Sequence, residues 1–177
     1  SDSDGTCKKL HKKIIEAKTQ TAGRGRMNRV FYSPDSTGIY MSVIWCEEIN
    51  NPALYTATAA VAVTRALQKI CGVETGIKWV NDLYLKGKKI CGILAEGKIN
   101  LHTGKIAALV VGIGVNIEMP EGGFPSFAGK AGVVYDKHVS ESIREQLTEE
   151  IARNVILLYE HKEIFPSVMD DYRGKSV

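Results

Sequence analysis

The stretch KWVNDLYLKGKKICGILAEG, residues 78–97, contains two short strand-like runs joined by a Lys-Gly turn. Aliphatic and aromatic residues dominate both runs, and a glycine between such runs is typical of a tight hairpin. We expect Asn81 and Asp82 to lie at the end of one strand, where their side chains face a cleft. The hairpin then brings Lys89 back on the neighbouring strand, close to Gly92.

Further strand-like segments lie on both sides of this hairpin. GIYMSVIW alternates in the strand manner and is rich in β-branched and aromatic residues, and KIAALVVGIGVNI follows a His-Thr-Gly turn. A shorter strand is expected just before a loop rich in glycine and arginine. These strands are predicted at residues 14–18, 38–45, 76–80 and 105–117.

Two longer segments carry helix signals. Residues 52–70 are the clearer case, because Asn51 can cap the start, a proline suits the first turn and Gly72 follows the end. Residues 141–165 place apolar residues three or four positions apart, which indicates one buried helical face. A short helix is also expected around residues 7–12. The stripe of the later helix consists of Ile143, Leu147, Ile151, Val155 and Leu158.

Length and composition favour one domain with a packed core. The chain has 177 residues, 44% of them hydrophobic, and the order of its elements predicts an α+β fold, a mixed β-sheet flanked by helices, over residues 1–177. Its 23 basic and 20 acidic side chains leave a net charge of +3, too balanced for a general nucleic-acid surface. The longest apolar run, residues 106–115, is too short to span a membrane as a helix. Neither DNA nor a membrane is expected as a partner.

The cysteines show no recognisable framework. Cys7, Cys46, Cys71 and Cys91 form no C-x-x-C pair, and no histidine has a zinc-like spacing from two of them. We interpret all of them as reduced and mostly buried thiols, because a chain of this size and apolar content does not need disulfides. With no signal peptide at the start, this interpretation predicts a cytoplasmic location.

The stretch QTAGRGRMNR, residues 20–29, combines glycine with arginine. Glycine lets the backbone approach a ligand, and arginine supplies a fixed charge with a planar fork of donors. The combination favours an anion held close to the main chain. By contrast, Lys86 and Lys88 taken alone are more simply solvated turn residues.

GIGVN, residues 112–116, places glycines inside a strand. Such glycines permit close approach of a ligand, and Asn116 can both donate and accept hydrogen bonds. No third glycine or helix follows at the spacing of a dinucleotide fingerprint, and the sequence contains no P-loop. The Asn81-Asp82 pair alone would also fit an ordinary Asx turn.

Taken together, these motifs resemble the biotin protein ligase family, also called biotin–[acetyl-CoA-carboxylase] ligase. QTAGRGR, YSP, GIYMS, KWVNDLYLKGKKICGIL and GIGVN occur in this order over residues 14–118, and the late helix with MDDYRGKS is similar to the end of that catalytic domain. The resemblance implies the fold shared with class II aminoacyl-tRNA synthetases and lipoate ligases. It implies that biotin and ATP form biotinyl-5′-AMP and pyrophosphate. Biotin then passes to one lysine of a biotin carboxyl carrier protein.

The resemblance also assigns roles. Gln20 and residues 23–26 correspond to positions that contact biotin and the adenylate, and Lys89 to the lysine that bridges the biotin carboxylate and the α-phosphate. A point cation there lowers the cost of bringing two negative groups together. Asp82 corresponds to a position near the nucleotide, where it is a candidate for holding Mg²⁺ with the phosphates.

Other site residues follow from the same resemblance. Asn81 lies near the nucleotide, Asn116 lies beside the adenosine, and Phe31 stands where many members carry a tryptophan that stacks on adenine. The implied catalytic residues are Lys89, Arg24 and Arg26. The implied biotin- and adenylate-binding residues are Ser1, Ser3, Gln20, Gly23, Arg24, Gly25, Arg26, Phe31, Lys78, Asn81, Asp82, Lys89, Gly92 and Asn116.

The sequence departs from the family at its ends. Ser1, Asp2 and Ser3 stand where members usually show Ser-Thr-Asn or Ser-Thr-Ser, and the connection to the first strand is several residues short. A DNA-binding helix-turn-helix and a C-terminal SH3-like domain are not visible. The resemblance leaves a homodimer through a sheet edge open, although the sequence identifies no such edge.

Two other functions remain open at this point. A lipoate–protein ligase or octanoyltransferase would use a similar lysine, but its usual arginine-arginine and glycine-triplet stretch is not found. A non-catalytic module that senses biotin or an adenylate would keep the pocket and lose turnover. Release of pyrophosphate distinguishes an enzyme from such a sensor.

Overall fold

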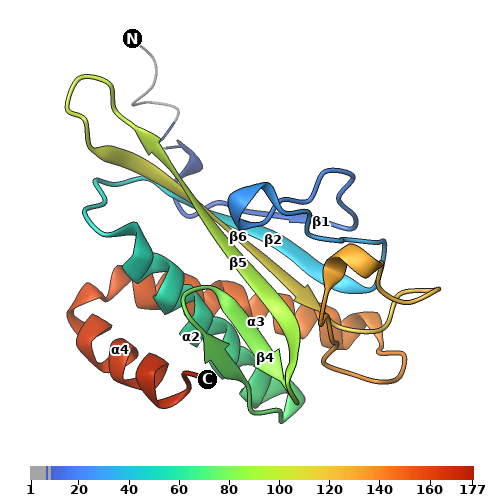
Figure 1. The fold of residues 1–177 in the computed structure, drawn as a ribbon. Coiled ribbons are helices and arrows are strands. Elements are labelled where there is room, and N and C mark those ends of the chain that lie inside the picture. Colours follow the sequence, from blue (N-terminus) through green and yellow to red (C-terminus); the bar gives the residue numbers. More distant parts are fainter. Residues whose placement is uncertain (1–6, 8) are drawn as a thin grey trace.

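A computed structural model describes residue 7 and residues 9–177 of the chain. Its six-stranded sheet has the order β1-β2-β6-β5-β4-β3, and α2, α3 and α4 lie on one side of it (Figure 1). The strands are β1 (Ile14–Ala17), β2 (Gly38–Trp45), β3 (Gly76–Lys78), β4 (Asp82–Leu85), β5 (Lys88–Ile99) and β6 (Ile106–Asn116). The helices are α2 (Pro52–Cys71), α3 (Glu141–Glu160) and α4 (Phe165–Gly174), with short 3-10 turns η1 (Arg26–Asn28), η2 (Ser126–Ala128) and η3 (Lys162–Ile164).

The predicted α+β fold, with a sheet flanked by helices, is confirmed. Neighbouring strands of the sheet all pair in the antiparallel sense. The parallel part of the sheet is limited to isolated bridges, Ile77 with Ser176 and Lys89 with Ala131. The first bridge ties the end of the chain to the edge strand β3. The second ties the loop after β6 to the start of β5.

The side of the sheet that faces the helices forms the hydrophobic core. Val43 of β2, and Val111 and Ile113 of β6, are at most 2% exposed. α2 contributes buried alanines such as Ala59 and Ala60 to the same cluster. Small side chains let a helix approach a sheet closely, so α2 packs directly on the strands. The predicted stripe of α3 also joins this core: Leu147, Ile151, Val155 and Leu158 are buried, and Ile143 is half-buried.

The caps predicted for the first long helix are present. Asn51 Oδ1 accepts a hydrogen bond from Leu54 N at 3.3 Å, and Gly72 ends α2 with a left-handed φ of 66°. A side chain with a Cβ would be strained in that conformation. Helical backbone at Cys7 and Leu10 agrees with the short helix expected near the start of the chain.

The predicted helix over residues 141–165 is wrong at its end. α3 stops at Glu160, a 3-10 turn follows, and the separate helix α4 begins at Phe165. Pro166 stands in the first turn of α4 and has no backbone N–H, so it suits a new start and cannot continue α3. Within the described part of the chain, no helix is both long and apolar enough to cross a membrane.

The opposite side of β5 and β6 carries Gly92, Gly112 and Gly114 among larger side chains such as Leu94. Gly92 pairs with Gly114, and Leu94 pairs with Gly112. The loop between β1 and β2 and the loop after β6 lie on this side of the sheet (Figure 1). The missing side chains at these glycines leave space beneath the two loops.

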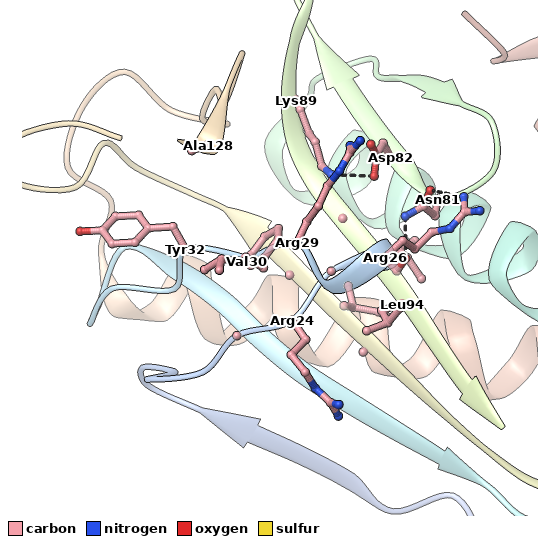
Figure 2. Close-up of a pocket in the computed structure, with 18 of the residues that line it drawn as sticks. Arg24, Arg26, Arg29, Val30, Tyr32, Asn81, Asp82, Lys89, Leu94 and Ala128 are labelled. Carbon is pink, nitrogen blue, oxygen red and sulfur yellow. Dashed lines mark hydrogen bonds and ion pairs between the residues drawn. The ribbon is translucent and has the colours of Figure 1, made fainter. Parts of the chain in front are cut away.

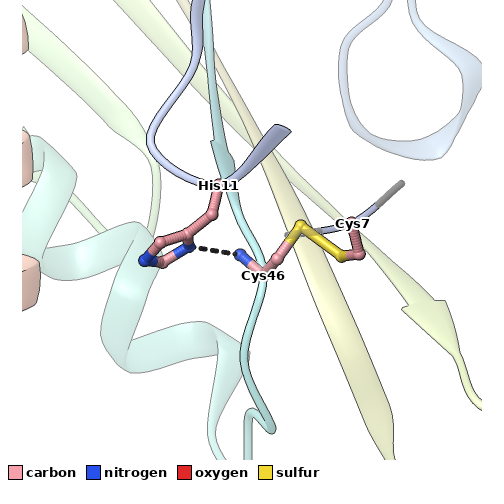
Figure 3. The surroundings of a disulfide bond; sticks show 3 residues. All are labelled: Cys7, His11 and Cys46. Carbon is pink, nitrogen blue, oxygen red and sulfur yellow. Dashed lines mark hydrogen bonds between the residues drawn. A yellow bond between two sulfur atoms is a disulfide. The ribbon is translucent and has the colours of Figure 1, made fainter. Parts of the chain in front are cut away.

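The interpretation of every cysteine as a reduced thiol is wrong for two of them. Cys7 and Cys46 form a disulfide, with Cα atoms 5.8 Å apart (Figure 3). The contact arises because the N-terminal segment lies along the end of β2. There His11 Nδ1 accepts a hydrogen bond from Cys46 N at 3.0 Å, and Lys12 N donates to Ile44 O at 2.8 Å.

The other two cysteines fit the interpretation. Cys91 is buried in the core and Cys71 is half-buried, and both are free thiols. Burial raises the pKa of each thiol, which keeps both in the unreactive protonated form near neutral pH. Because Cys7 and Cys46 form a disulfide, the cysteines as a group do not support the predicted cytoplasmic location, which was based on reduced thiols.

Candidate active site

A cavity of about 870 Å³ lies on the open side of the sheet, between its strands and the two loops. All predicted site residues that the structure describes line this cavity, although they come from distant parts of the sequence. The lining members are Gln20, Gly23, Arg24, Gly25, Arg26, Phe31, Lys78, Asn81, Asp82, Lys89, Gly92 and Asn116. The predicted residues Ser1 and Ser3 lie outside the described residues.

The glycine–arginine loop is a compact excursion between β1 and β2. Isolated bridges join Gln20 to Ser33 and Arg24 to Val30 across its base. A Cβ at Gly23 would lie 2.3 Å from the carbonyl oxygen of Phe31, so only glycine fits there. The close packing explains why this loop needs glycine beside its arginines.

Two arginines of this loop are tethered to the sheet. Arg24 Nη2 lies 3.2 Å from Glu96 Oε2 on β5, and Arg26 Nη1 donates to Asn81 Oδ1 at 3.2 Å. Asn81 is itself fixed, because its Nδ2 donates to Ile93 O at 2.9 Å. Figure 2 shows that Arg24 points away from Arg26 and Asn81, so the loop is held at two separate points.

Lys89 and Asp82 face each other across the β4–β5 hairpin. The Lys89 Nζ and Asp82 Oδ1 atoms are 2.7 Å apart (Figure 2), and both side chains are half-buried. The pairing register shifts between Leu83 and Tyr84, and this irregularity brings the two side chains to the same face. The pair places a cation with a fixed position at the wall of the cavity.

Glycines of β5 and β6 form part of the floor of the cavity, beside the side chains of Leu94 and Val110. A Cβ at Gly114 would lie 2.4 Å from Phe31 Cε1, and one at Gly92 would lie 3.1 Å from Phe31 Cε2. The Phe31 ring therefore rests directly on these two glycines. An aromatic ring over a flat strand surface is suited to bind planar groups.

Two predicted binding residues also make contacts within the protein. Asn116 is buried, and its Nδ2 donates to Gly132 O at 3.1 Å, which holds the loop after β6. The ammonium of Lys78 lies over the Tyr84 ring, 5.7 Å from its centroid. Asn116 therefore shapes the cavity wall whether or not it contacts a ligand.

The fit of a metal ion depends on a single carboxylate. The described residues contain no group of three His, Cys, Asp or Glu side chains that could hold a metal ion. Mg²⁺ is commonly held by one or two carboxylates together with phosphate oxygens and water. Asp82 therefore fits such an ion only when a bound nucleotide supplies further oxygens.

A family model described as the biotin/lipoate A/B protein ligase family matches residues 6–116. The chain belongs to this family. The matched segment contains the glycine–arginine loop, the β4–β5 hairpin and the glycine-bearing strand β6, which build most of the cavity, whereas the loop after β6 that also lines it lies outside the match.

Individual relatives agree with this assignment. The bifunctional ligase/repressor BirA of Bacillus subtilis is 39% identical over 115 residues, which are 63% of this chain and 34% of that protein. The biotin–[acetyl-CoA-carboxylase] ligase of Mycobacterium tuberculosis is 27% identical over 172 residues, 93% of this chain and 60% of that protein. The chain thus spans about a third of the length of the BirA proteins that it matches.

A solved structure shares both the fold and part of the sequence. The biotin protein ligase from Aquifex aeolicus, in complex with biotin and ATP, superposes with a TM-score of 0.73 and 26% identity. The match covers 94% of this chain and 69% of that one. The similarity therefore extends beyond the segment that the family model matches, into α3 and α4.

The cavity of this family member contains further residues that the sequence did not reveal. Tyr32 makes edge contacts with Phe124 and Phe127, with ring centroids 6.5 and 6.3 Å apart, and so joins the two loops. Glu96 and Trp79 also line the cavity. The sequence signal for these residues was the presence of aromatic side chains in the Gly- and Pro-rich loop after β6. The contacts of these side chains with Tyr32 depend on how the two loops fold.

Proposed function

We propose that this chain activates biotin with ATP and transfers it to a protein lysine. The observation that carries the proposal is the position of Lys89, which shares one cavity with the glycine–arginine loop and the glycines of β5 and β6. The relative from Aquifex aeolicus is described in complex with biotin and ATP, which supports both as substrates here. The single carboxylate of Asp82 is the candidate contact for Mg²⁺ that enters with the nucleotide.

In the first step the biotin carboxylate oxygen attacks the α-phosphorus of ATP, and the bond to pyrophosphate breaks. Both reacting groups are negative, so the ammonium of Lys89 lowers the barrier by lying between them. Asp82 holds that ammonium in place before the substrates arrive. Arg24 and Arg26 supply donors to the phosphate from the loop above. Mg²⁺ would add charge neutralisation at the phosphates.

In the second step the amine of an acceptor lysine attacks the acyl carbon of biotinyl-5′-AMP, and AMP leaves. The adenylate is a mixed anhydride that water would hydrolyse, so the loops that cover the cavity protect it. The name of the relative from Mycobacterium tuberculosis supports a carrier domain of acetyl-CoA carboxylase, or of a related carboxylase, as the acceptor.

The test is an adenylation assay with α-labelled ATP, Mg²⁺ and biotin. We expect labelled biotinyl-AMP with biotin, none with lipoate, and a loss of about 100-fold or more in the variant Lys89→Ala. Product with lipoate alone would assign the chain to the lipoate branch of the family. Tight biotin binding without pyrophosphate release would contradict an enzyme and favour a sensor.

A further inference from the structure

The disulfide between Cys7 and Cys46 joins the start of the chain to the sheet (Figure 3). Both cysteines are partly exposed, so a reductant can reach the bond. The other two cysteines are free thiols, and burial raises the pKa of each. Thiols that stay protonated react slowly in thiol–disulfide exchange. The response of this chain to reducing and oxidising thiol buffers is therefore concentrated at Cys7 and Cys46.

The disulfide lies beside a row of residues that reaches the cavity. Cys46 directly follows β2 and stands two positions beyond Ile44, which pairs with Val110 of β6. Val110 pairs in turn with Glu96 of β5, and both of these residues line the cavity. Glu96 also holds Arg24 of the glycine–arginine loop. Two residues of a strand extend about 7 Å, so the disulfide is close to this row.

Two kinds of contact hold the first described residues on the sheet. From His11 onward the contacts are hydrogen bonds to β2 and to the residue after it: His11 Nδ1 accepts from Cys46 N, and Lys12 N donates to Ile44 O. Within the described part of the chain, no hydrogen bond or ion pair joins residues 7, 9 or 10 to the sheet. The disulfide supplies that link, so its reduction releases this part while residues 11–13 keep their hydrogen bonds.

The residues before the disulfide include two predicted biotin contacts. Ser1 and Ser3 lie outside the described residues, and the family resemblance assigns both of them to biotin. Ser3 precedes Cys7 by four positions, and an extended chain of four residues spans at most about 14 Å. Fixing Cys7 on the sheet therefore limits the distance between Ser3 and the cavity. Such a constraint raises the effective concentration of a binding group at its site.

We propose that the disulfide between Cys7 and Cys46 is a redox clasp that controls the affinity for biotin. The oxidised form holds the start of the chain beside the cavity, whereas the reduced form releases it and binds biotin more weakly. This inference rests on the proposed function and adds the regulation of its biotin site.

The redox step is thiol–disulfide exchange with a dithiol. One thiolate of the dithiol attacks a sulfur of the disulfide, and the other cysteine leaves as a thiolate. The second thiol of the reductant then resolves the mixed disulfide. Two electrons and two protons pass to the cysteines, and the reductant becomes a disulfide.

The first experiment measures the biotin Kd of oxidised and reduced protein by isothermal titration calorimetry without ATP. Dithiothreitol is the reductant, and thermal unfolding of the reduced form sets a temperature at which it stays folded. We expect the Kd to rise by about tenfold or more on reduction and to recover on reoxidation. Cys7→Ser/Cys46→Ser should bind weakly in both buffers. Cys71→Ser, which changes a free thiol outside the disulfide, should respond like the parent.

The variant Ser1→Ala/Ser3→Ala separates the clasp from a general loosening of the fold. If the disulfide acts through the start of the chain, this variant binds weakly in both buffers and the ratio of its two Kd values falls toward one. A tenfold ratio that persists would overturn the proposal, and so would equal Kd values for the oxidised and reduced parent. A Kd that depends on the disulfide, in a protein that makes no biotinyl-AMP, would support the clasp and contradict the proposed activity alone.

The second experiment uses the reciprocity of linked equilibria. If oxidation strengthens biotin binding tenfold, saturating biotin must favour the disulfide over the two thiols by the same factor. For a two-electron couple this factor corresponds to about 30 mV, so biotin should lower the midpoint potential of the disulfide by about 30 mV. Alkylation of the free thiols in buffers of defined ratios of reduced to oxidised dithiothreitol measures the midpoint. A midpoint that biotin leaves unchanged would contradict the clasp.

Discussion

At the scale of single residues, Gly114 tests the floor of the cavity. Its added Cβ would lie 2.4 Å from Phe31 Cε1, whereas one at Gly112 would find its nearest neighbours at 3.6 and 4.0 Å. Gly114→Ala should therefore lower the free energy of unfolding by about 1–2 kcal/mol through overpacking. Gly112→Ala, on the same face of the same strand, should change it by less than about 0.5 kcal/mol. Urea unfolding measures both, and equal effects would show that Phe31 does not rest on Gly114.

The pair of Arg24 and Glu96 tests how the glycine–arginine loop is held. Both side chains are largely exposed, and such pairs contribute little to global stability. Glu96→Gln should instead release the loop, and amide hydrogen exchange at residues 24–29 should become faster. Glu48→Gln breaks the comparably exposed pair with Lys105 and serves as the control. Unchanged exchange in the Glu96 variant would mean that the Arg26–Asn81 hydrogen bond and the backbone contacts hold the loop without this pair.

The local sequence identified residues that line the cavity, but it did not predict the contacts that these residues make with one another. A glycine inside a strand, or next to an arginine, already indicates that another group approaches the backbone closely. Gly23 and Gly92 are examples. The pairing of Arg24 with Glu96 joins residues 72 positions apart and depends on the final strand register. No pattern in the sequence encodes it. The roles of the cavity residues in binding and catalysis stay predictions.

At the scale of elements, Glu118 links the end of β6 to the start of α3. Its carboxylate accepts a hydrogen bond from Val139 N at 2.8 Å and lies 3.3 Å from Arg144 Nη1. Burial alone would raise the pKa of Glu118, but the contacts with Val139, His138 and Arg144 outweigh it and lower the pKa below its usual value. The carboxylate form is therefore the one that stabilises the fold.

The pH dependence follows from the sign of this shift. A lowered pKa in the folded state contributes stability above the unfolded pKa of about 4.3, and this contribution disappears as the pH falls through the folded value. Glu118→Gln should cost about 1–2 kcal/mol at pH 7 and progressively less below pH ~4. Urea unfolding of the parent and the variant, at pH 7 and again below pH ~4, measures this difference. A cost that stays constant with pH would contradict a charge-dependent link.

Elements with complete local signals were predictable, and elements defined by packing were not. α2 has its cap at Asn51 and its glycine at the end, and its bounds follow from these residues. Pro166 marks the start of α4, whereas α3 already ends at Glu160, within a pattern that otherwise continues to be apolar at helical spacing. The short helix α4 packs its Val168 and Tyr172 into the core, and their spacing of four positions was a signal for a shared helical face that the predicted single helix did not include.

At the scale of the whole molecule, the sheet brings every motif to one side. The antiparallel order places β5 and β6 at the centre, so that the loop before β2, the β4–β5 hairpin and the loop after β6 all reach the same cavity. The order of the motifs along the sequence resembles that of biotin protein ligases, and this resemblance predicted that the motifs form one site. The single domain over residues 1–177 and the homodimer stay predictions.

The disulfide between Cys7 and Cys46 acts on the whole molecule, because it closes a loop across 39 positions that includes the glycine–arginine loop. In the chain-entropy model such a crosslink stabilises the folded state by about 3–4 kcal/mol. Reductant should lower the free energy of unfolding by this amount. The double variant Cys7→Ser/Cys46→Ser should start at the lower value and not respond to reductant. Thiol titration in denaturant should count two thiols before reduction and four after it. Four thiols in the untreated protein, with no effect of reductant on unfolding, would show that the two cysteines are not joined in solution.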